Sequence, residues 1–118
     1  MQKVMRIISK PDPEVHGATL LELTGRLDAL GATELWDAAS PHLTAASPSA
    51  LVDMSRVDIM SSAGISTLIR LLTRTKSNGG KLGVFGCNAG VRRVFEIVGL
   101  EGLLNVCDTA EEARQRLL

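Results

Sequence analysis

The sequence predicts an α/β fold, with one mixed, mostly parallel β-sheet of about five strands and about four α-helices. Two patterns support this prediction. From position 48 onward, apolar runs and amphipathic stretches alternate in the order strand, helix, strand, helix, strand, helix. Such alternation requires crossover connections, which join parallel strands. Before position 48, two short apolar runs flank a proline-containing turn, which predicts an antiparallel hairpin at one side of the sheet. The length of 118 residues suits one compact core, so we expect a single domain over 1–118.

The hairpin is predicted from the first apolar run, Val4–Ser9, and the second, Ala18–Thr24. Pro11-Asp12-Pro13 ends the first run because proline disfavours continuation of a regular element. The second run alternates, so that Leu21 and Leu23 can face the core.

A helix is predicted next, from about Ala32 to Leu43. Gly25-Arg26-Leu27-Asp28 breaks the strand pattern before it, and Leu35, Ala38, Ala39 and Leu43 follow at helical spacing. Pro48 prevents any continuation of this helix. The third strand is predicted at Ala50–Met54.

The rest of the chain supplies the repeated strand and helix units. Their predicted ranges are helix Ile65–Arg74, strand Lys81–Phe85, helix Val91–Val98, strand Leu103–Val106 and helix Asp108–Leu118. Asn78-Gly79-Gly80 ends the first of these helices with residues that accept positive φ. The last helix has two possible N-caps, Asp108 with Glu111 or Thr109 with Glu112.

Composition limits the classes of function. Lys and Arg (13) balance Asp and Glu (13), which argues against a protein that depends on phosphate contacts with nucleic acid. Two cysteines and two histidines form no pattern of metal ligands, and we interpret Cys87 and Cys107 as small hydrophobes. The sequence contains neither a signal-peptide run nor an apolar segment of about 20 residues. We therefore expect a cytoplasmic protein with no membrane insertion.

The patterns that suggest catalysis have simpler interpretations. Gly83–Gly90 (GVFGCNAG) has the glycines of a phosphate loop but neither its Lys-Ser/Thr nor the spacing of a dinucleotide site, so turn chemistry is favoured. Asp53 and Asp58 have no His, Lys or third carboxylate placed in the sequence to assist them. Without a nucleophile and base, we expect no enzymatic activity and no cofactor.

Two adjacent serines, Ser61 and Ser62, stand where the third strand passes into a helix. Serine is a favoured N-cap, but a cap needs only one serine, and Ile65 occupies the capping-box position. The small residues Ala63 and Gly64 are expected to leave the backbone bare and approachable. A helix start with an exposed hydroxyl also suits phosphorylation, so the residues alone leave a cap and a cap with modification equally open.

The segments Asp53–Val57 and Ile59–Ile65 (DMSRV and IMSSAGI) resemble the signature of STAS domains, in particular the bacterial anti-sigma factor antagonists. Gly25-Arg26-Leu27-Asp28 is similar to the family's Gly-x-Leu-Asp turn, and the segment from Val91 follows its last strand and helix pattern. The family's common motif is Asp-Ser-Ser/Thr-Gly, in which the first Ser accepts a phosphate. At matching positions, Ser62 is the acceptor, and Ser61 replaces the Asp.

The resemblance implies a switch between two proteins. The unmodified domain would bind an anti-sigma factor that is a serine kinase and so release a sigma factor. The kinase would phosphorylate Ser62 to end the interaction, and a PP2C-type phosphatase would reset it. The partner-binding residues it implies are Asp28, Ser55, Ser61, Ser62, Ala63 and Gly64. The expected oligomeric state is a monomer or a weak dimer.

Two alternatives from other classes stay open. One is a STAS subunit of a membrane lipid-transport complex that has no phosphorylation switch. The other is a module that senses a nucleotide or anion at the same helix start.

Overall fold

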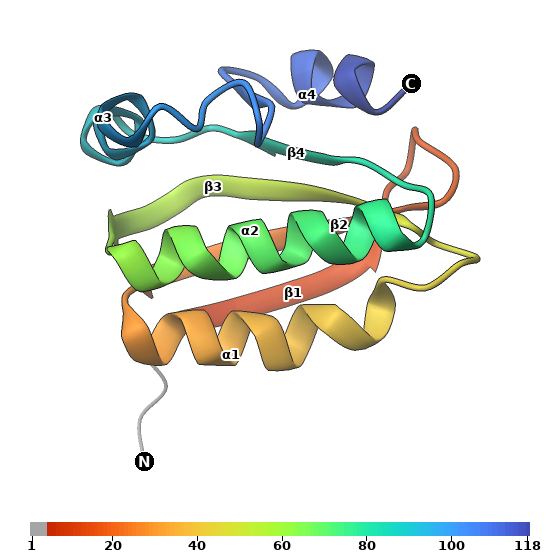
Figure 1. Cartoon of the computed structure of the whole chain (residues 1–118), viewed down its shortest axis with the longest axis horizontal. Coiled ribbons are helices and arrows are strands. Elements are labelled where there is room, and N and C mark those ends of the chain that lie inside the picture. Colours follow the sequence, from red (N-terminus) through yellow and green to blue (C-terminus); the bar gives the residue numbers. More distant parts are fainter. Residues whose placement is uncertain (1–4) are drawn as a thin grey trace.

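The computed structural model describes residues 5–118, and its five-stranded sheet has the order β1-β2-β3-β4-β5 (Figure 1). The strands are β1 (Met5–Pro11), β2 (Ala18–Leu27), β3 (Ser49–Met60), β4 (Leu82–Phe85) and β5 (Val106–Cys107). The helices are α1 (Ala29–Ala39), a short 3-10 turn (Ser40–His42), α2 (Ser62–Ser77), α3 (Ala89–Val98) and α4 (Ala110–Leu117). Among these described strands, β1 and β2 pair antiparallel and every other neighbouring pair is parallel. The predicted α/β fold with a mixed, mostly parallel sheet is confirmed.

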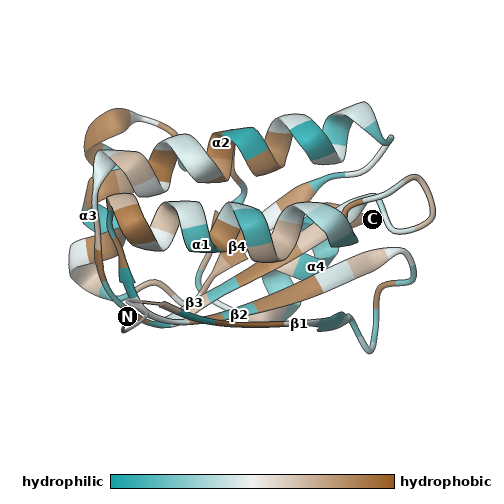
Figure 2. Cartoon of the chain, turned by 90° about the horizontal axis from the view of Figure 1, so that it is seen from below, coloured by the Kyte–Doolittle hydropathy of each residue, from teal (hydrophilic) through white to brown (hydrophobic). Residues whose placement is uncertain are grey.

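The helices cover the two faces of the sheet unequally. Side chains of α1, α2 and α3 join one large apolar cluster against one face, and Figure 2 shows α1 and α2 side by side over the sheet. A smaller cluster beneath α4 covers the other face; it contains Ala18, Leu20, Leu51, Cys107, Ala113 and Leu117. The core is almost wholly aliphatic, as the scarcity of aromatic residues predicts.

β3 is the largest departure from the prediction, since it continues past Met54 to Met60. Its register against β2 shifts twice, and each shift leaves one extra residue in β3. These two bulges place Met54, Val57 and Met60 in the core at a spacing of three. A prediction of this strand from strict alternation of apolar and polar residues therefore ends too early, at Met54.

Other element boundaries also differ. The first strand continues to Pro11, which an edge strand tolerates, and Val4 lies outside the described residues. The Gly25–Asp28 segment does not break β2, which runs through Leu27. α1 begins earlier and ends earlier than predicted, at Ala29 and Ala39, while α2 extends beyond Ile65–Arg74 at both ends.

The C-terminal part contains one wrong strand position. The predicted strand Leu103–Val106 is incorrect because Leu103 and Leu104 lie in a turn and β5 consists of Val106 and Cys107. Before α4, Thr109 is the N-cap and not Asp108: Glu112 N donates to Thr109 Oγ1 at 3.2 Å.

Candidate functional site

The serine pair lies where β3 passes into α2, at the carboxyl end of the parallel strands. Ser61 is the N-cap residue, with extended backbone angles (φ −101°, ψ 177°), but its side chain does not cap the helix. Ser61 N donates instead to the Leu27 carbonyl oxygen at 3.0 Å, and Ser61 Oγ lies 3.5 Å from the same oxygen. The N-cap residue is thus Ser61 and not Ser62, for which Ile65 would be the capping-box position, and the Ser61 hydroxyl is turned toward the end of β2.

The start of α2 therefore keeps free hydrogen-bond donors. Ser62 is exposed at the first helical position, and the backbone N–H groups of Ser62 and Ala63 bond to no residue that the structure describes. The other three helices each have a side-chain cap, from Asp28, Asn88 and Thr109. Unpaired N–H groups and the helix dipole make such a start favourable for a negative charge.

Gly64 differs from its expected role. It is buried, and a Cβ atom there would lie 2.7 Å from both Leu27 Cγ and Leu27 O. No real Cβ tolerates contacts this short with backbone, so the position requires glycine for the close packing of α2 on the end of β2. Its backbone is not bare; Ala63 is half-buried beside it.

Asp28 lies next to the serine pair because Leu27 connects them. The Asp28 Oδ1 atom accepts from Gly31 N at 3.0 Å and so caps α1, while Arg26 Nε lies 3.8 Å from Oδ2. The starts of α1 and α2 consequently meet at one end of the sheet, the left side of Figure 1.

Ser55 lies elsewhere. It is exposed in the first bulge of β3, where its N–H donates to Asp53 Oδ1 at 2.9 Å. Ser61 is six positions further along the chain, which corresponds to on the order of 20 Å along a strand. The structure brings Asp28, Ser61, Ser62, Ala63 and Gly64 together and leaves Ser55 apart.

Two exposed apolar residues lie near Ser61 and Asp28 in the sequence, and sequence reasoning missed both. Ile59 is 59% exposed near the end of β3, two positions before Ser61, and Leu30 is 45% exposed in the first turn of α1, two positions after Asp28. The signal for Ile59 was hidden because the strand was predicted to end at Met54. Both side chains are available to a partner that contacts this end of the sheet.

The glycine-rich segment 83–90 contains the predicted turn at 86–88, between the end of β4 and the start of α3. Gly86 has φ +79° after β4, and Asn88 caps α3 by accepting from Val91 N at 2.8 Å. Burial raises the pKa of the Cys87 thiol to about 11 and also raises that of Cys107, so both thiols stay protonated at neutral pH. Within residues 5–118, no group of three His, Cys, Asp or Glu side chains could hold a metal ion.

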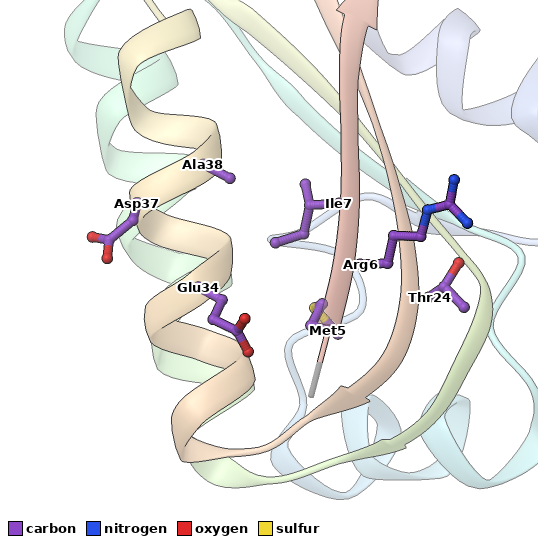
Figure 3. Close-up of a pocket in the computed structure, with 7 residues that line it drawn as sticks. All are labelled: Met5, Arg6, Ile7, Thr24, Glu34, Asp37 and Ala38. Carbon is purple, nitrogen blue, oxygen red and sulfur yellow. The ribbon is translucent and has the colours of Figure 1, made fainter. Parts of the chain in front are cut away.

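A groove of about 690 Å³ lies between α1 and β1, away from the serine pair (Figure 3). Glu34 extends from α1 toward the strand, while Asp37 points away from it. Arg6 lies on the opposite side of β1, near Thr24. The charged groups of this groove do not converge on one point, so we assign it no chemistry.

The chain matches known proteins over most of its length. The model of the family described as "Mlab, STAS domain" matches residues 13–105. An anti-sigma-B factor antagonist from Staphylococcus aureus is 26% identical over 91 residues, which cover 77% of this chain and 84% of that protein.

Two solved structures have the same fold. An anti-sigma factor antagonist from Mycobacterium paratuberculosis superposes with a TM-score of 0.82 at 18% identity, covering 99% of this chain and 97% of that one. The Bacillus cell fate determinant SpoIIAA in its phosphorylated form gives 0.67 at 21% identity, covering 92% and 98%. At these identities the likeness concerns the fold alone. Across residues 5–118, no helix combines the length and apolar character needed to cross a bilayer.

Proposed function

The chain belongs to the STAS domain family, and from this premise we propose that it is an anti-sigma factor antagonist that acts by binding and not by catalysis. Its unphosphorylated form binds an anti-sigma factor that is also a serine kinase, and thereby releases a sigma factor in the cytoplasm. The kinase phosphorylates Ser62 to end the interaction, and a PP2C-type phosphatase restores it. The resemblance of this chain to the anti-sigma factor antagonists supports the proposal.

The observation that carries the proposal is the exposed Ser62 hydroxyl at an uncapped helix start. A phosphate brings about −1.5 to −2 charge at pH 7. The free N–H groups of Ser62 and Ala63 and the positive end of the helix dipole can accept that charge without disturbing the core. Phosphorylation is therefore expected to leave the fold intact.

Binding responds differently to the same charge. A partner that packs on Leu30, Ile59 and the serine pair removes water from this surface. A phosphate trapped in that contact would lose its hydration without gaining a matched cation, which is strongly unfavourable. The switch thus acts on the interface.

Phosphate mapping tests the assignment of Ser62. The purified chain is incubated with its cognate kinase and ATP, and the phosphate is located by mass spectrometry. We expect a single phosphate on Ser62. Phosphate on Ser61 alone, or none despite demonstrated binding of the kinase, would contradict the assignment.

Charge substitution tests the switch itself, with calorimetric titration against the kinase. Ser62→Asp should weaken binding about tenfold or more, equivalent to about 1.4 kcal/mol. Ser62→Ala should bind like the wild type and resist inactivation by the kinase. Ser61→Asp is the matched control; it should weaken binding less, because the family motif carries a carboxylate at that position. If Ser61→Asp weakened binding more than Ser62→Asp, the motif match would be wrong by one residue.

A transport role predicts another result. If the chain were a subunit of a membrane lipid-transport complex without a phosphorylation switch, it would copurify with transporter subunits. Ser62→Asp would then leave that association unchanged.

A further inference from the structure

Acidic residues are absent from Ile59 to Phe95, although the chain as a whole is neutral. This segment contains six basic residues, three of which lie exposed on α2: Arg70, Arg74 and Lys76. The hydrophilic bands on the C-terminal half of α2 are visible in Figure 2. The charge of the chain is therefore segregated, and every charged residue on the outer face of α2 is a cation.

A groove of about 590 Å³ separates the C-terminal halves of α1 and α2. We call it the α1–α2 groove and define it by Trp36, Leu43, Ile69, Arg70, Arg74 and Asn78. Its volume lies within the range of about 300–1,000 Å³ that is usual for binding sites. Trp36, Leu43 and Ile69 supply apolar surface, and Arg70, Arg74 and Asn78 supply hydrogen-bond donors.

Both arginines are held in place by contacts within the groove. The guanidinium carbon of Arg70 lies 3.9 Å from the centre of the Trp36 ring, and Arg74 Nε donates to Leu43 O at 3.1 Å. Neither arginine forms an ion pair with a carboxylate of residues 5–118. Arginines that are positioned in advance lose less conformational freedom when a ligand binds.

We propose that the α1–α2 groove docks an acidic segment of a partner protein, with an apolar side chain against Trp36 and carboxylates on Arg70 and Arg74. Arginine and carboxylate form paired, charge-assisted hydrogen bonds, and tryptophan and arginine are the residues that most often dominate interface energies. The cationic face supplies the charge complementarity, since no carboxylate on α2 would repel such a segment.

This site is separate from the proposed switch. Arg70 and Arg74 lie about 12 and about 18 Å from Ser62 along the axis of α2, from the rise per residue of a helix. The inference therefore goes beyond the proposed function and does not depend on phosphorylation of Ser62.

NMR titration of the ¹⁵N-labelled full chain tests the proposal. The probe is a short synthetic peptide that carries Leu and Phe among Asp and Glu residues. One comparison peptide has every acid replaced by its amide, and another keeps the acids but has Leu and Phe replaced by Ser. A single-stranded DNA oligonucleotide tests for a general preference for polyanions. We expect saturable shifts of the Trp36 indole and of the Ile69 and Arg70 amides with the acidic peptide, weakened by salt.

Paired variants decide the result. Arg70→Gln/Arg74→Gln should lower the affinity for the acidic peptide about tenfold or more, whereas Arg93→Gln/Arg116→Gln, which removes the same charge elsewhere, should not. If the NMR spectrum of the double variant shows that it is unfolded, the single variant Arg70→Gln replaces it in the comparison. Ser62→Asp should bind the peptide like the wild type. The proposal would be overturned by peptide-induced shifts that map outside the groove, or by the same affinity of the two double variants for the acidic peptide. Binding of the amide peptide or of the DNA as tightly as the acidic peptide would also overturn it.

Discussion

Asp12 connects the β1–β2 turn to α4, at the C-terminal end of the chain. Its side chain is fully buried in the β1–β2 turn, where it accepts from Val15 N at 2.8 Å and Glu14 N at 3.1 Å. Arg114 of α4 donates to both carboxylate oxygens, at 3.0 Å from Nη2 to Oδ1 and 3.1 Å from Nε to Oδ2. Burial acts to raise the pKa of Asp12, but these hydrogen bonds outweigh burial and hold the pKa below its ordinary value.

We predict that Asp12→Asn lowers the free energy of unfolding at neutral pH by about 1.5–3 kcal/mol, the range of hydrogen bonds to charged groups. A carboxyl with a lowered folded-state pKa contributes stability above its unfolded-state pKa, and loses it as pH falls through the folded-state pKa. The difference between variant and wild type should therefore be full above about pH 5 and shrink below about pH 4. Urea denaturation at neutral and acid pH measures it.

Glu14→Gln is the control for this prediction. Glu14 also pairs with Arg114, but its side chain is exposed, so its loss should cost under about 1 kcal/mol. A loss for Asp12→Asn that does not change with pH would contradict the role of its charge.

At the scale of elements, the N-cap residue of a helix can also connect that helix to a strand. Asn88 caps α3 through its carbonyl oxygen, while its Nδ2 donates to Val57 O at 3.1 Å and to Asp58 O at 3.3 Å. These bonds occupy the second bulge of β3, where the ladder to β2 is interrupted. One side chain thus fixes α3 against the strand that leads to the serine pair.

Asn88→Asp separates the two tasks of this residue. The carboxylate still accepts from Val91 N, but it cannot donate to Val57 O, and its charge faces carbonyl oxygens. We predict a loss of about 1–2 kcal/mol in the free energy of unfolding, measured by urea denaturation. Asp28→Asn, the reverse change at the cap of α1, should cost no more than about 0.5 kcal/mol because both residues cap equally well. Equal effects of the two variants would mean that Asn88 serves only as a cap.

At the scale of the whole molecule, the sheet carries a core on each face. Ala50 and Val52 face the large cluster beneath α1 and α2, whereas Leu51 faces α4. Neighbouring residues of one strand belong to both clusters, and Arg114 connects α4 to the β1–β2 turn, so loss of either helix layer exposes one face of the sheet that both layers share. We therefore expect the chain to unfold as one unit.

Two probes on opposite faces test this cooperativity. Trp36, the only tryptophan, reports on the α1–α2 layer by fluorescence. Cys107, buried beneath α4, reports on the other face by its reaction with a thiol reagent in a Cys87→Ala variant. The two midpoints in urea should coincide. Labelling of Cys107 at lower urea than the fluorescence change would show that α4 opens separately.

Much of this architecture can be predicted from local patterns. The end of α2 at Asn78 appears in the structure as predicted, and Ile65, Leu68 and Leu72 lie on the buried face of this helix. The failures share a cause. β3 beyond Met54 and the shifted β5 are set by pairing with neighbouring strands, and bulges or a two-residue strand leave no periodic pattern to detect.

The candidate site shows the same division. The motif by itself identified Ser61, Ser62, Ala63, Gly64 and Asp28, because residue types and spacing along the chain carry the family signature. Which of these residues face solvent was decided only by the tertiary structure. Gly64 is buried against Leu27, and Ser61 turns to the Leu27 carbonyl, leaving Ser62 as the exposed hydroxyl. These contacts join residues more than thirty positions apart, so no local propensity encodes them. Close packing of α2 on β2 determines them, and it also sets the α1–α2 groove, whose arginines and tryptophan come from two separate helices.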